Sequence, residues 1–400
     1  MVRITPDLIK GLITRNGNLY VPEYICDAIG SCVVSDPVVV QKEGERLKAL
    51  YESYQTKLEP IKTSYLEDAT IDAYSIYYLP RNTLVPKLAL LVCAYHRTFQ
   101  ALPNKLRVLD LGSGTGGVIL GLLDLFQNEP LSKISLDITA VDSSPGSLQR
   151  QRQLVNCVAP DSSVRCIEAD LTSPKDYRPK LSTGTPYDMV FAANILTELE
   201  EPVIFILLQD VAGLLSENGL LISVESARDY TGQQFSRINK NAVGLGLNIY
   251  YPCPPQFSCQ KPKCWMWRED EFECPDISVS NESVATTTVQ KAYWLILCKQ
   301  SCSVFDMLLE RNPTYTWGIK AHIGKERTTE DKVEQEYEVC TPEGLRKLVH
   351  KRGKDQLFVL LESEPHKRGS FIGWTADFSV VETWDPISGF KVLKSKGHET

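Results

Sequence analysis

A glycine-rich segment between an expected strand and an expected helix constrains the fold of this chain more than any other feature. The segment Asp110-Leu-Gly-Ser-Gly-Thr-Gly-Gly117 follows the apolar run 106–111 and precedes the helix-forming stretch 117–127. Glycine lets the backbone turn sharply and lets a ligand approach it closely. In open parallel sheets, ligands bind in the crevice at the carboxyl ends of the strands. The segment therefore predicts a ligand-binding turn near the start of an α/β domain.

The chain beyond this turn alternates between short apolar runs and helical stretches. The expected strands are 134–141, 164–168, 187–192, 219–224 and, later, 292–298, and the expected helices are 144–155, 202–215 and 235–244. Strands that alternate with helices in this way predict a doubly wound parallel sheet.

Three acidic residues indicate which ligand the turn suits. Asp110 lies two positions before the first glycine, Asp142 ends the second strand and Asp170 ends the third. The glycines alone would also fit a dinucleotide, but a carboxylate at position 110 suits an ammonium group and repels a pyrophosphate. Asp142 can accept hydrogen bonds from ribose hydroxyls, a feature shared with NAD enzymes. Asp170 can accept one from an adenine amino group.

Together these features resemble the S-adenosylmethionine (SAM)-dependent methyltransferases, whose class I domains have a Rossmann-like sheet. The resemblance implies SAM as the cofactor and a methyltransferase as the enzyme class. It implies cofactor contacts from the loop and the strand ends, namely Asp110, Gly112, Ser113, Gly114, Gly116, Asp142, Ser143, Asp170, Leu171 and Asn194.

No catalytic residue is assigned from the sequence. The fourth strand ends Phe191-Ala-Ala-Asn194 and lacks the N/D-P-P-Y/F tetrapeptide with which amino-methylating enzymes hold a base nitrogen. Glu198 follows, and we expect it to cap or brace the next helix.

Four hundred residues are too many for one typical core, so several domains are expected. Helical spacing at 39–54 predicts a helical N-terminal region, and short alternating runs at 316–323, 335–340, 357–362 and 370–375 predict a small β-domain. The expected divisions are 1–100 for the helical region, 101–312 for the SAM-binding domain with a Cys-rich insertion at 250–290, 313–385 for the β-domain and 386–400 for a frayed tail.

The insertion carries a cluster of cysteines. Cys253, Cys259 and Cys264 fall within a short segment rich in proline and polar residues. Thiolates are soft ligands suited to zinc or iron–sulfur clusters, and a metal-free loop is the alternative. A tetrahedral centre needs a fourth ligand. Spacing leaves Cys274, Cys298, Cys302 and Cys340 open for this role, with Cys274 the nearest in sequence.

Several motifs carry a closer resemblance. Leu196-Thr-Glu-Leu199, Gly219-Leu-Leu-Ile-Ser-Val-Glu225, Pro252-Cys-Pro254 and Val339-Cys-Thr-Pro-Glu-Gly344 occur in this order. Over about residues 75 to 375 the chain resembles the methyltransferase-like proteins of the small ribosomal subunit, found on mitochondrial ribosomes or their precursors and in prokaryotes. The resemblance implies a [4Fe–4S] cluster held by Cys253, Cys259, Cys264 and Cys340, with Cys274 in reserve and zinc as the alternative metal. The family often has His where this chain has Pro255, which affects the surroundings of the cluster rather than its ligands.

The same resemblance implies small-subunit rRNA as the partner, acted on by an RNA methyltransferase or held by a catalytically inactive binding factor. A small-molecule methyltransferase with a structural zinc is the rival function. The net charge of −7 argues against an overall basic coat. The basic run 345–354 nevertheless fits phosphate contacts, unless it is an exposed loop balanced by Glu334, Glu336 and Glu338.

The chain lacks an apolar stretch long enough to cross a membrane. Its first residues carry neither a signal sequence nor a transit pattern. We expect a monomeric protein in the cytoplasm, or in mitochondria if a presequence precedes this chain.

Overall fold

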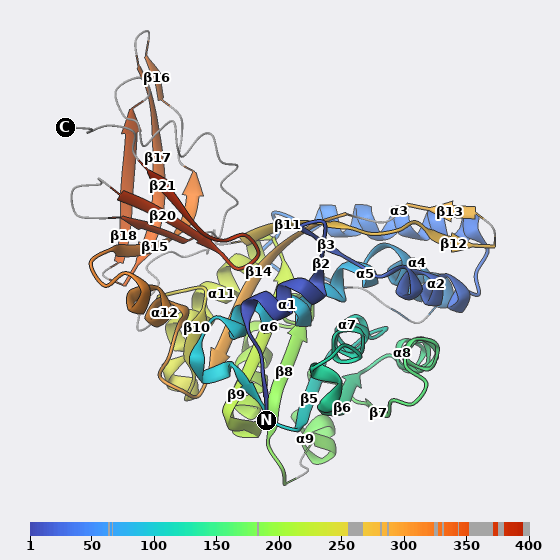
Figure 1. The fold of residues 1–400 in the computed structure, drawn as a ribbon. Helices are drawn as coiled ribbons and strands as arrows, with labels where there is room; N and C mark the ends of the chain where they lie inside the picture. The colour runs from blue at the N-terminus through green and yellow to red at the C-terminus, as the bar shows by residue number, and fades with distance from the viewer. Residues whose placement is uncertain are drawn as a thin grey trace. The chain divides into compact units, whose positions relative to one another are not determined.

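A computed structural model shows that the chain divides into two compact units (Figure 1). The first contains Met1–Thr231 and Asp270–Ala292, and the second contains Gly232–Glu269 and Tyr293–Thr400. The structure describes all residues except 63, 64, 66, 182, 183, 255–266, 281, 286, 287, 324–326, 330, 331, 343, 352–370, 375–379 and 395–400.

Parallel strands form the central sheet of the first unit, in the order β9-β8-β5-β6-β7. Their bounds are β5 Lys105–Leu111, β6 Ser135–Asp142, β7 Val164–Glu168, β8 Tyr187–Ala193 and β9 Leu215–Ser226. Val108 of β5 pairs with Ile138 on one side and Met189 on the other. The strand order therefore reverses at β5, and ligands bind at such a switch point. The predicted Rossmann-like α/β fold is confirmed.

The helices that connect these strands are α7 Gly117–Phe126, α8 Pro145–Val158, α9 Pro174–Leu181 and α10 Glu201–Leu214, with the short 3-10 helices η2 Leu131–Lys133 and η3 Leu196–Glu198. Three of the α-helices, α7, α8 and α10, were predicted from the sequence, whereas α9 was not. The start of α8 illustrates why they form here. The Ser144 hydroxyl accepts a hydrogen bond from the Ser147 N–H at 3.1 Å, and Pro145 occupies the first helical position, two features that favour helix initiation.

The N-terminal region is helical, as predicted, but it also contains short strands. The helices are α1 Pro6–Ile13, α2 Glu23–Cys32, α3 Pro37–Ser53, α4 Asp68–Tyr77, α5 Leu79–Asn82, α6 Leu84–Ala94 and η1 Arg97–Phe99; the strands are β1 Val2–Arg3, β2 Thr14–Arg15, β3 Asn18–Tyr20 and β4 Ala101–Leu102. Asn16 and Gly17 join β2 to β3 with φ of 52° and 85°. Asn-Gly favours such two-residue hairpins, and this signal was missed.

Helices α6 and α7 form the buried centre of the first unit, and every residue of both is buried. Lys87 of α6 is fully buried, and its Nζ lies 2.5 Å from Oδ2 of Asp124 in α7. Burial lowers the pKa of Lys87, while Asp124 opposes that shift. None of the helices in the described ranges is long and apolar enough to cross a membrane.

An antiparallel sheet dominates the second unit, in the order β16-β17-β15-β19-β20-β21, with β18 paired to β17. Its strands are β15 Thr316–Ile323, β16 Arg327–Thr329, β17 Lys332–Thr341, β18 Gly344–Lys351, β19 Phe371–Trp374, β20 Val380–Asp385 and β21 Gly389–Lys394. The small β-domain is confirmed, although the expected strand 357–362 lies outside the described residues. Strand β21 lies in the expected tail, and it pairs with β20 through the turn 385–389.

The remaining elements lie between these two sheets in the sequence. They are α11 Asp229–Asn241, η4 Val243–Leu245, β10 Asn248–Tyr251, β11 Trp267–Glu273, β12 Ile277–Val279, β13 Glu282–Val284, β14 Val289–Cys298 and α12 Val304–Arg311. Aromatic rings pack within the second unit, where the Phe371 ring lies 5.1 Å from Trp384, 5.4 Å from Phe305 and 6.0 Å from Tyr251 between centroids.

Candidate functional site: a cavity at the carboxyl ends of the strands

The glycine loop lies between β5 and α7, at the switch point of the sheet. Gly112, Gly114 and Gly116 have φ of 65°, 52° and 91°, a left-handed conformation that side chains other than glycine rarely adopt. A Cβ on Gly112 would lie 2.8 Å from Ile195, whereas a Cβ on Gly114 would meet nothing within 4 Å. Glycine at 112 therefore allows close packing, and glycine at 114 leaves open space beside the backbone.

Asp142, at the end of β6, holds this loop. Its Oδ2 accepts a hydrogen bond from the Gly114 N–H at 2.8 Å, and its Oδ1 accepts one from the Ser144 N–H at 2.8 Å. Burial raises the pKa of Asp142, and these hydrogen bonds to the ionised form oppose the shift. A backbone hydrogen bond from Ser143 acts in the same direction. The carboxylate thus shapes the loop, and three donors on about four lone-pair positions leave it acceptor capacity for a ligand.

Asp110 lies beneath the loop and is only 1% exposed. Its Oδ2 has no hydrogen-bond partner among the described residues, and the same holds for the hydroxyls of Ser113 and Thr115. Burial, with a smaller contribution from the charge of Asp142, raises the pKa of Asp110 well above its usual range. Buried polar atoms nearly always have partners, so this group of orphaned atoms fits a site that a polar ligand completes.

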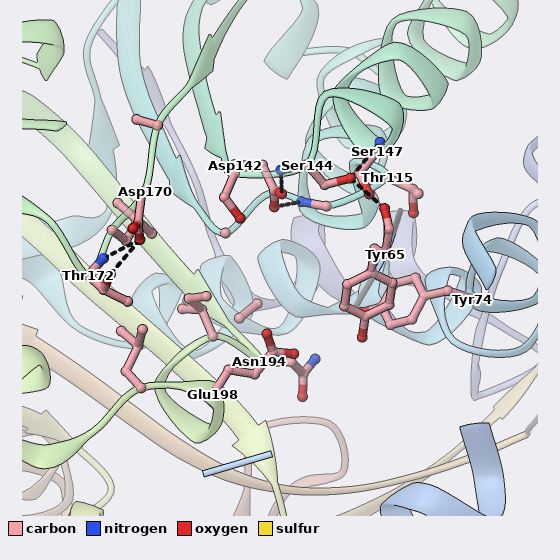
Figure 2. A pocket seen from close by; sticks show the side chains of 18 residues that line it. Tyr65, Tyr74, Thr115, Asp142, Ser144, Ser147, Asp170, Thr172, Asn194 and Glu198 are labelled. Atoms are coloured by element: carbon pink, nitrogen blue, oxygen red, sulfur yellow. Dashed lines mark hydrogen bonds between the residues drawn. The ribbon is translucent and has the colours of Figure 1, made fainter. Parts of the chain in front are cut away.

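A cavity of about 350 Å³ opens beside the loop (Figure 2). The predicted cofactor residues that line it are Gly112, Gly114, Asp142, Ser143, Asp170, Leu171 and Asn194. Asp110, Ser113 and Gly116 do not line it, so any contribution from them acts from behind its wall. Asp170 is exposed, and its Oδ1 accepts hydrogen bonds from the Thr172 N–H at 2.8 Å and hydroxyl at 2.7 Å.

Several lining residues were not predicted from the sequence. Polar or aromatic ones are Tyr65, Tyr74, Thr115, Ser144, Ser147 and Glu198. In Figure 2, Tyr65 and Tyr74 lie on the far side of Asp142 from Asp170, with Glu198 and Asn194 below. The tyrosines come from the N-terminal region, which carried no signal of a ligand site.

Glu225, at the end of β9, holds the loop that carries Glu198. Its carboxylate accepts hydrogen bonds from the backbone N–H groups of Ile195 at 3.1 Å, Leu196 at 2.8 Å and Thr197 at 3.2 Å. Burial raises the pKa of Glu225 to about 7, against the effect of these donors. Burial and the charges of Asp142 and Glu225 raise the pKa of Glu198 to about 8, against the opposing effect of the Arg228 cation. Glu198 therefore lines the cavity as a carboxyl group whose neutral form is favoured by its surroundings.

The structure describes only two of the four predicted metal ligands. Cys253, after β10, and Cys340, in β17, both belong to the second unit and are buried. Cys259 and Cys264 lie outside the described residues, and the described residues contain no cluster of three or more metal-ligating side chains. The reserve ligand Cys274 belongs to the first unit, where its Sγ lies 3.7 Å from that of Cys26. The four-cysteine site therefore stays a prediction.

Part of the basic run 345–354 lies opposite acidic positions of a neighbouring strand. Its first part lies in β18, antiparallel to the acidic strand β17, and the backbone register pairs Glu338 with Lys347 and Glu334 with Lys351. Acidic backbone positions therefore lie opposite two of the basic ones, within a strand rather than in the exposed loop of the alternative.

The comparisons with known proteins agree with this site. Residues 109–221 match a protein family described as a methyltransferase domain. The matched segment lies in the first unit and includes the glycine loop, Asp142, Asp170 and Asn194. No curated protein matches the chain significantly in sequence.

Solved structures with a similar fold include several methyltransferases. One is the magnesium protoporphyrin IX methyltransferase of Synechocystis PCC 6803 with bound SAM, at 13% identity over 67% of this chain and 99% of that one, with a TM-score of 0.34. Another is the ribosomal protein L11 methylase of Lactobacillus delbrueckii subsp. bulgaricus, at 17% identity over 41% and 69%, with a TM-score of 0.29. The plantazolicin methyltransferase with a substrate analogue and SAH shows 19% identity over 47% and 62%, with a TM-score of 0.30. Similarities this weak say nothing about a substrate.

Proposed function

We propose that this protein binds SAM in the cavity beside the glycine loop and acts as a methyltransferase on the small ribosomal subunit, with a [4Fe–4S] cluster on four cysteines. The observation that carries SAM binding is the open space at Gly114, bordered by Asp142 and backed by the orphaned carboxylate oxygen of Asp110, within a segment that matches a methyltransferase domain.

The chain's own residues suggest how the cofactor is held. The free lone pairs of Asp142 suit ribose hydroxyls, and Asp170 and Leu171 lie where an adenine contact is expected. Asp110 lies behind the loop with an unpartnered carboxyl oxygen, and an ammonium group bound nearby would favour its ionised form. Bound SAM would supply an electrophilic methyl group, and the chain would orient the acceptor and take up its proton.

Binding of SAM is tested by calorimetry with SAM, SAH and NAD(H) on the full chain. We expect SAM and SAH to bind and NAD(H) to bind much more weakly. Preferential binding of NAD(H) would overturn the assignment of the cofactor.

The cluster is supported by the chemistry and burial of two ligands and by local packing. Tyr251, two residues before Cys253, packs on Phe371 at 6.0 Å. Phe371 pairs with Ile319, which pairs with Cys340, so two strand spacings of about 4.8 Å separate Phe371 from Cys340. Both cysteines thus belong to one packed region of the second unit, whereas Cys274 lies in the first unit, with its Sγ 3.7 Å from that of Cys26.

Anaerobic purification tests the metal. Protein that carries four iron atoms per chain and shows the visible absorption of a thiolate cluster would support the proposal. Colourless protein with one zinc would overturn the assignment of the cluster but support the four ligands. Metal-free protein would overturn both.

Association with the ribosome rests on the family resemblance, since the register of β18 weakens the support from the basic run. Crosslinking in cells followed by sequencing of bound RNA tests it. Enrichment of small-subunit rRNA is the expected result. Its absence would favour the small-molecule methyltransferase, and rRNA binding without methyl transfer would favour the inactive binding factor.

A further inference from the structure

A second cavity, of about 490 Å³, adjoins the first within the first unit. The two cavities share four lining residues, Tyr65, Tyr74, Asn194 and Glu198. Asp170 lines the first cavity only, and Figure 2 shows it on the far side of Asp142 from the tyrosines. The second cavity therefore joins the first at the end away from the expected adenine contact.

One wall of the second cavity is a cluster of tyrosines. The rings of Tyr74 and Tyr78 are stacked, with centroids 5.5 Å apart and an interplanar angle of 26°. Tyr51 meets Tyr78 edge-on at 5.1 Å, and Tyr65 meets Tyr74 edge-on at 5.4 Å. Four aromatic rings on one wall suit a planar ligand, because flat rings stack on one another.

The hydroxyls of these tyrosines are largely occupied by one another and by Asn82. The hydroxyls of Tyr51 and Tyr65 lie 2.7 Å apart, and the Tyr74 hydroxyl accepts a hydrogen bond from Asn82 Nδ2 at 3.1 Å. Burial raises the pKa of Tyr74 to about 12. The wall is therefore uncharged at neutral pH and offers ring surface rather than charge.

A buried arginine supplies hydrogen-bond donors to the same cavity. Arg228 lines the cavity and is only 2% exposed. Its Nη2 donates to the Thr197 carbonyl oxygen at 3.2 Å, while its Nε and Nη1 have no hydrogen-bond partner among the described residues. Unpaired buried donors are costly, so this guanidinium indicates that a ligand with acceptor oxygens or nitrogens completes the site.

The outer lining of the cavity is cationic. Lys48, Arg81 and Lys291 line it, opposed there by Glu52. Lys48 is exposed, Arg81 is half-buried over the Tyr78 ring at 4.7 Å, and neither forms a salt bridge with a described residue. These charges suit an anionic group attached to the planar ligand.

We propose that the second cavity binds the methyl acceptor and that the acceptor is a nucleotide, with its base against the tyrosines, its acceptor atoms at Arg228 and its phosphate near Lys48 and Arg81. This inference rests on the proposed function and deepens it. The chemistry is shared by a free nucleotide and by a nucleotide turned out of an RNA strand, as base-modifying enzymes require.

Glu198 lies where the two cavities meet and accepts the proton. A bond forms between a nitrogen or oxygen of the base and the methyl carbon. The bond between that carbon and the sulfonium sulfur breaks, and the sulfur keeps the electron pair. The proton lost by the acceptor passes to the Glu198 carboxylate, whose pKa of about 8 allows it to hold that proton.

The test measures binding of four mononucleotides, a mixed-sequence single-stranded RNA and benzoate to the full chain in the presence of SAH. Lys48→Gln combined with Arg81→Gln, and separately Tyr51→Leu, are expected to weaken nucleotide binding about tenfold each. Lys42 lies in α3, as Lys48 does, but does not line the cavity. We therefore expect Lys42→Gln to remove a positive charge and leave binding unchanged.

The outcomes separate this inference from the proposed function. Failure of the parent chain to bind SAH would sink the proposed function. Normal SAH binding without binding of any nucleotide or RNA, or tighter binding of benzoate than of every nucleotide, would overturn the inference alone. Binding of RNA but not of mononucleotides would identify the strand as the source.

The role of Glu198 is tested by methyl transfer from labelled SAM to bound RNA or nucleotide. The rate should rise with pH up to about 8 in the parent, because the protonated carboxyl cannot accept a proton, and this rise should vanish in Glu198→Gln. An unchanged pH profile in the variant, or no transfer by the parent up to pH 9, would remove Glu198 from this role.

Discussion

A single methyl group at Gly114 tests whether the cavity beside the glycine loop is the cofactor site. Gly114 lines the cavity and has a φ of 52°. A Cβ added at this position would enter open space. The left-handed conformation costs a non-glycine residue roughly 1–2 kcal/mol. The lower entropy of the unfolded alanine chain offsets roughly 0.4–1 kcal/mol of this. Gly114→Ala should therefore lower the free energy of unfolding by about 1 kcal/mol.

Gly184 provides a matched control. It has a φ of 72°, its Cβ would also meet nothing within 4 Å, and it is exposed and lines neither cavity. Both variants should lower the melting temperature by roughly 2–4 °C in calorimetry. Only Gly114→Ala should weaken SAM binding, by about tenfold or more, which corresponds to about 1.4 kcal/mol, because its methyl group fills space that the cofactor needs.

Equal SAM affinities in the two alanine variants would refute the idea that a ligand approaches the backbone at Gly114. A much larger loss of stability in Gly114→Ala than in Gly184→Ala would show instead that the added methyl group deforms the loop itself. Measuring affinity and melting temperature on the same samples separates these two results.

Three further predictions follow from the packing. Asp142→Asn should weaken SAM binding by about 1–3 kcal/mol, because the amide of the new asparagine would face a backbone N–H. Asp170→Asn should weaken it by less than about 1 kcal/mol. Equal losses in calorimetry would contradict this. Asp124→Asn should cost about 3–5 kcal/mol in urea unfolding because it leaves Lys87 buried without its counter-charge, and a paired Lys87→Met change should recover most of the loss. Cys340→Ser should abolish iron binding and raise hydrogen exchange in β17 without lowering SAM affinity, and full iron retention would exclude this ligand.

The sheet and its cofactor loop could be predicted from the sequence because their signals are local. Buried parallel strands read as short apolar runs, and a left-handed turn such as Gly114 needs glycine. Asp142 was predicted to contact the ligand and lines the cavity, but its hydrogen bond to the Gly114 N–H joins residues far apart in the chain. That bond could not be read from either segment alone.

Other parts of the site depend on tertiary packing. Tyr65 and Tyr74 line the cavity from a helical region whose spacing resembles that of any packed helix. Glu198 was expected only to cap or brace a helix. Its raised pKa arises from burial and from neighbouring carboxylates, and no local pattern in the sequence reveals either. The hairpin at Asn16-Gly17 is a different case, since its turn signal was present in the sequence.

The carboxylate of Glu225 accepts hydrogen bonds from three consecutive main-chain N–H groups of the loop that follows β8, and the Thr197 side chain contributes as well. The path of residues 195–197 therefore depends in large part on one side chain in another strand. Substitutions in this loop can change what the two cavities present to their ligands while the backbone keeps its course. Acceptor preference can therefore change through Ile195 and Thr197, which line the first and the second cavity, whereas Leu196 is buried and position 225 must retain an acceptor for three donors.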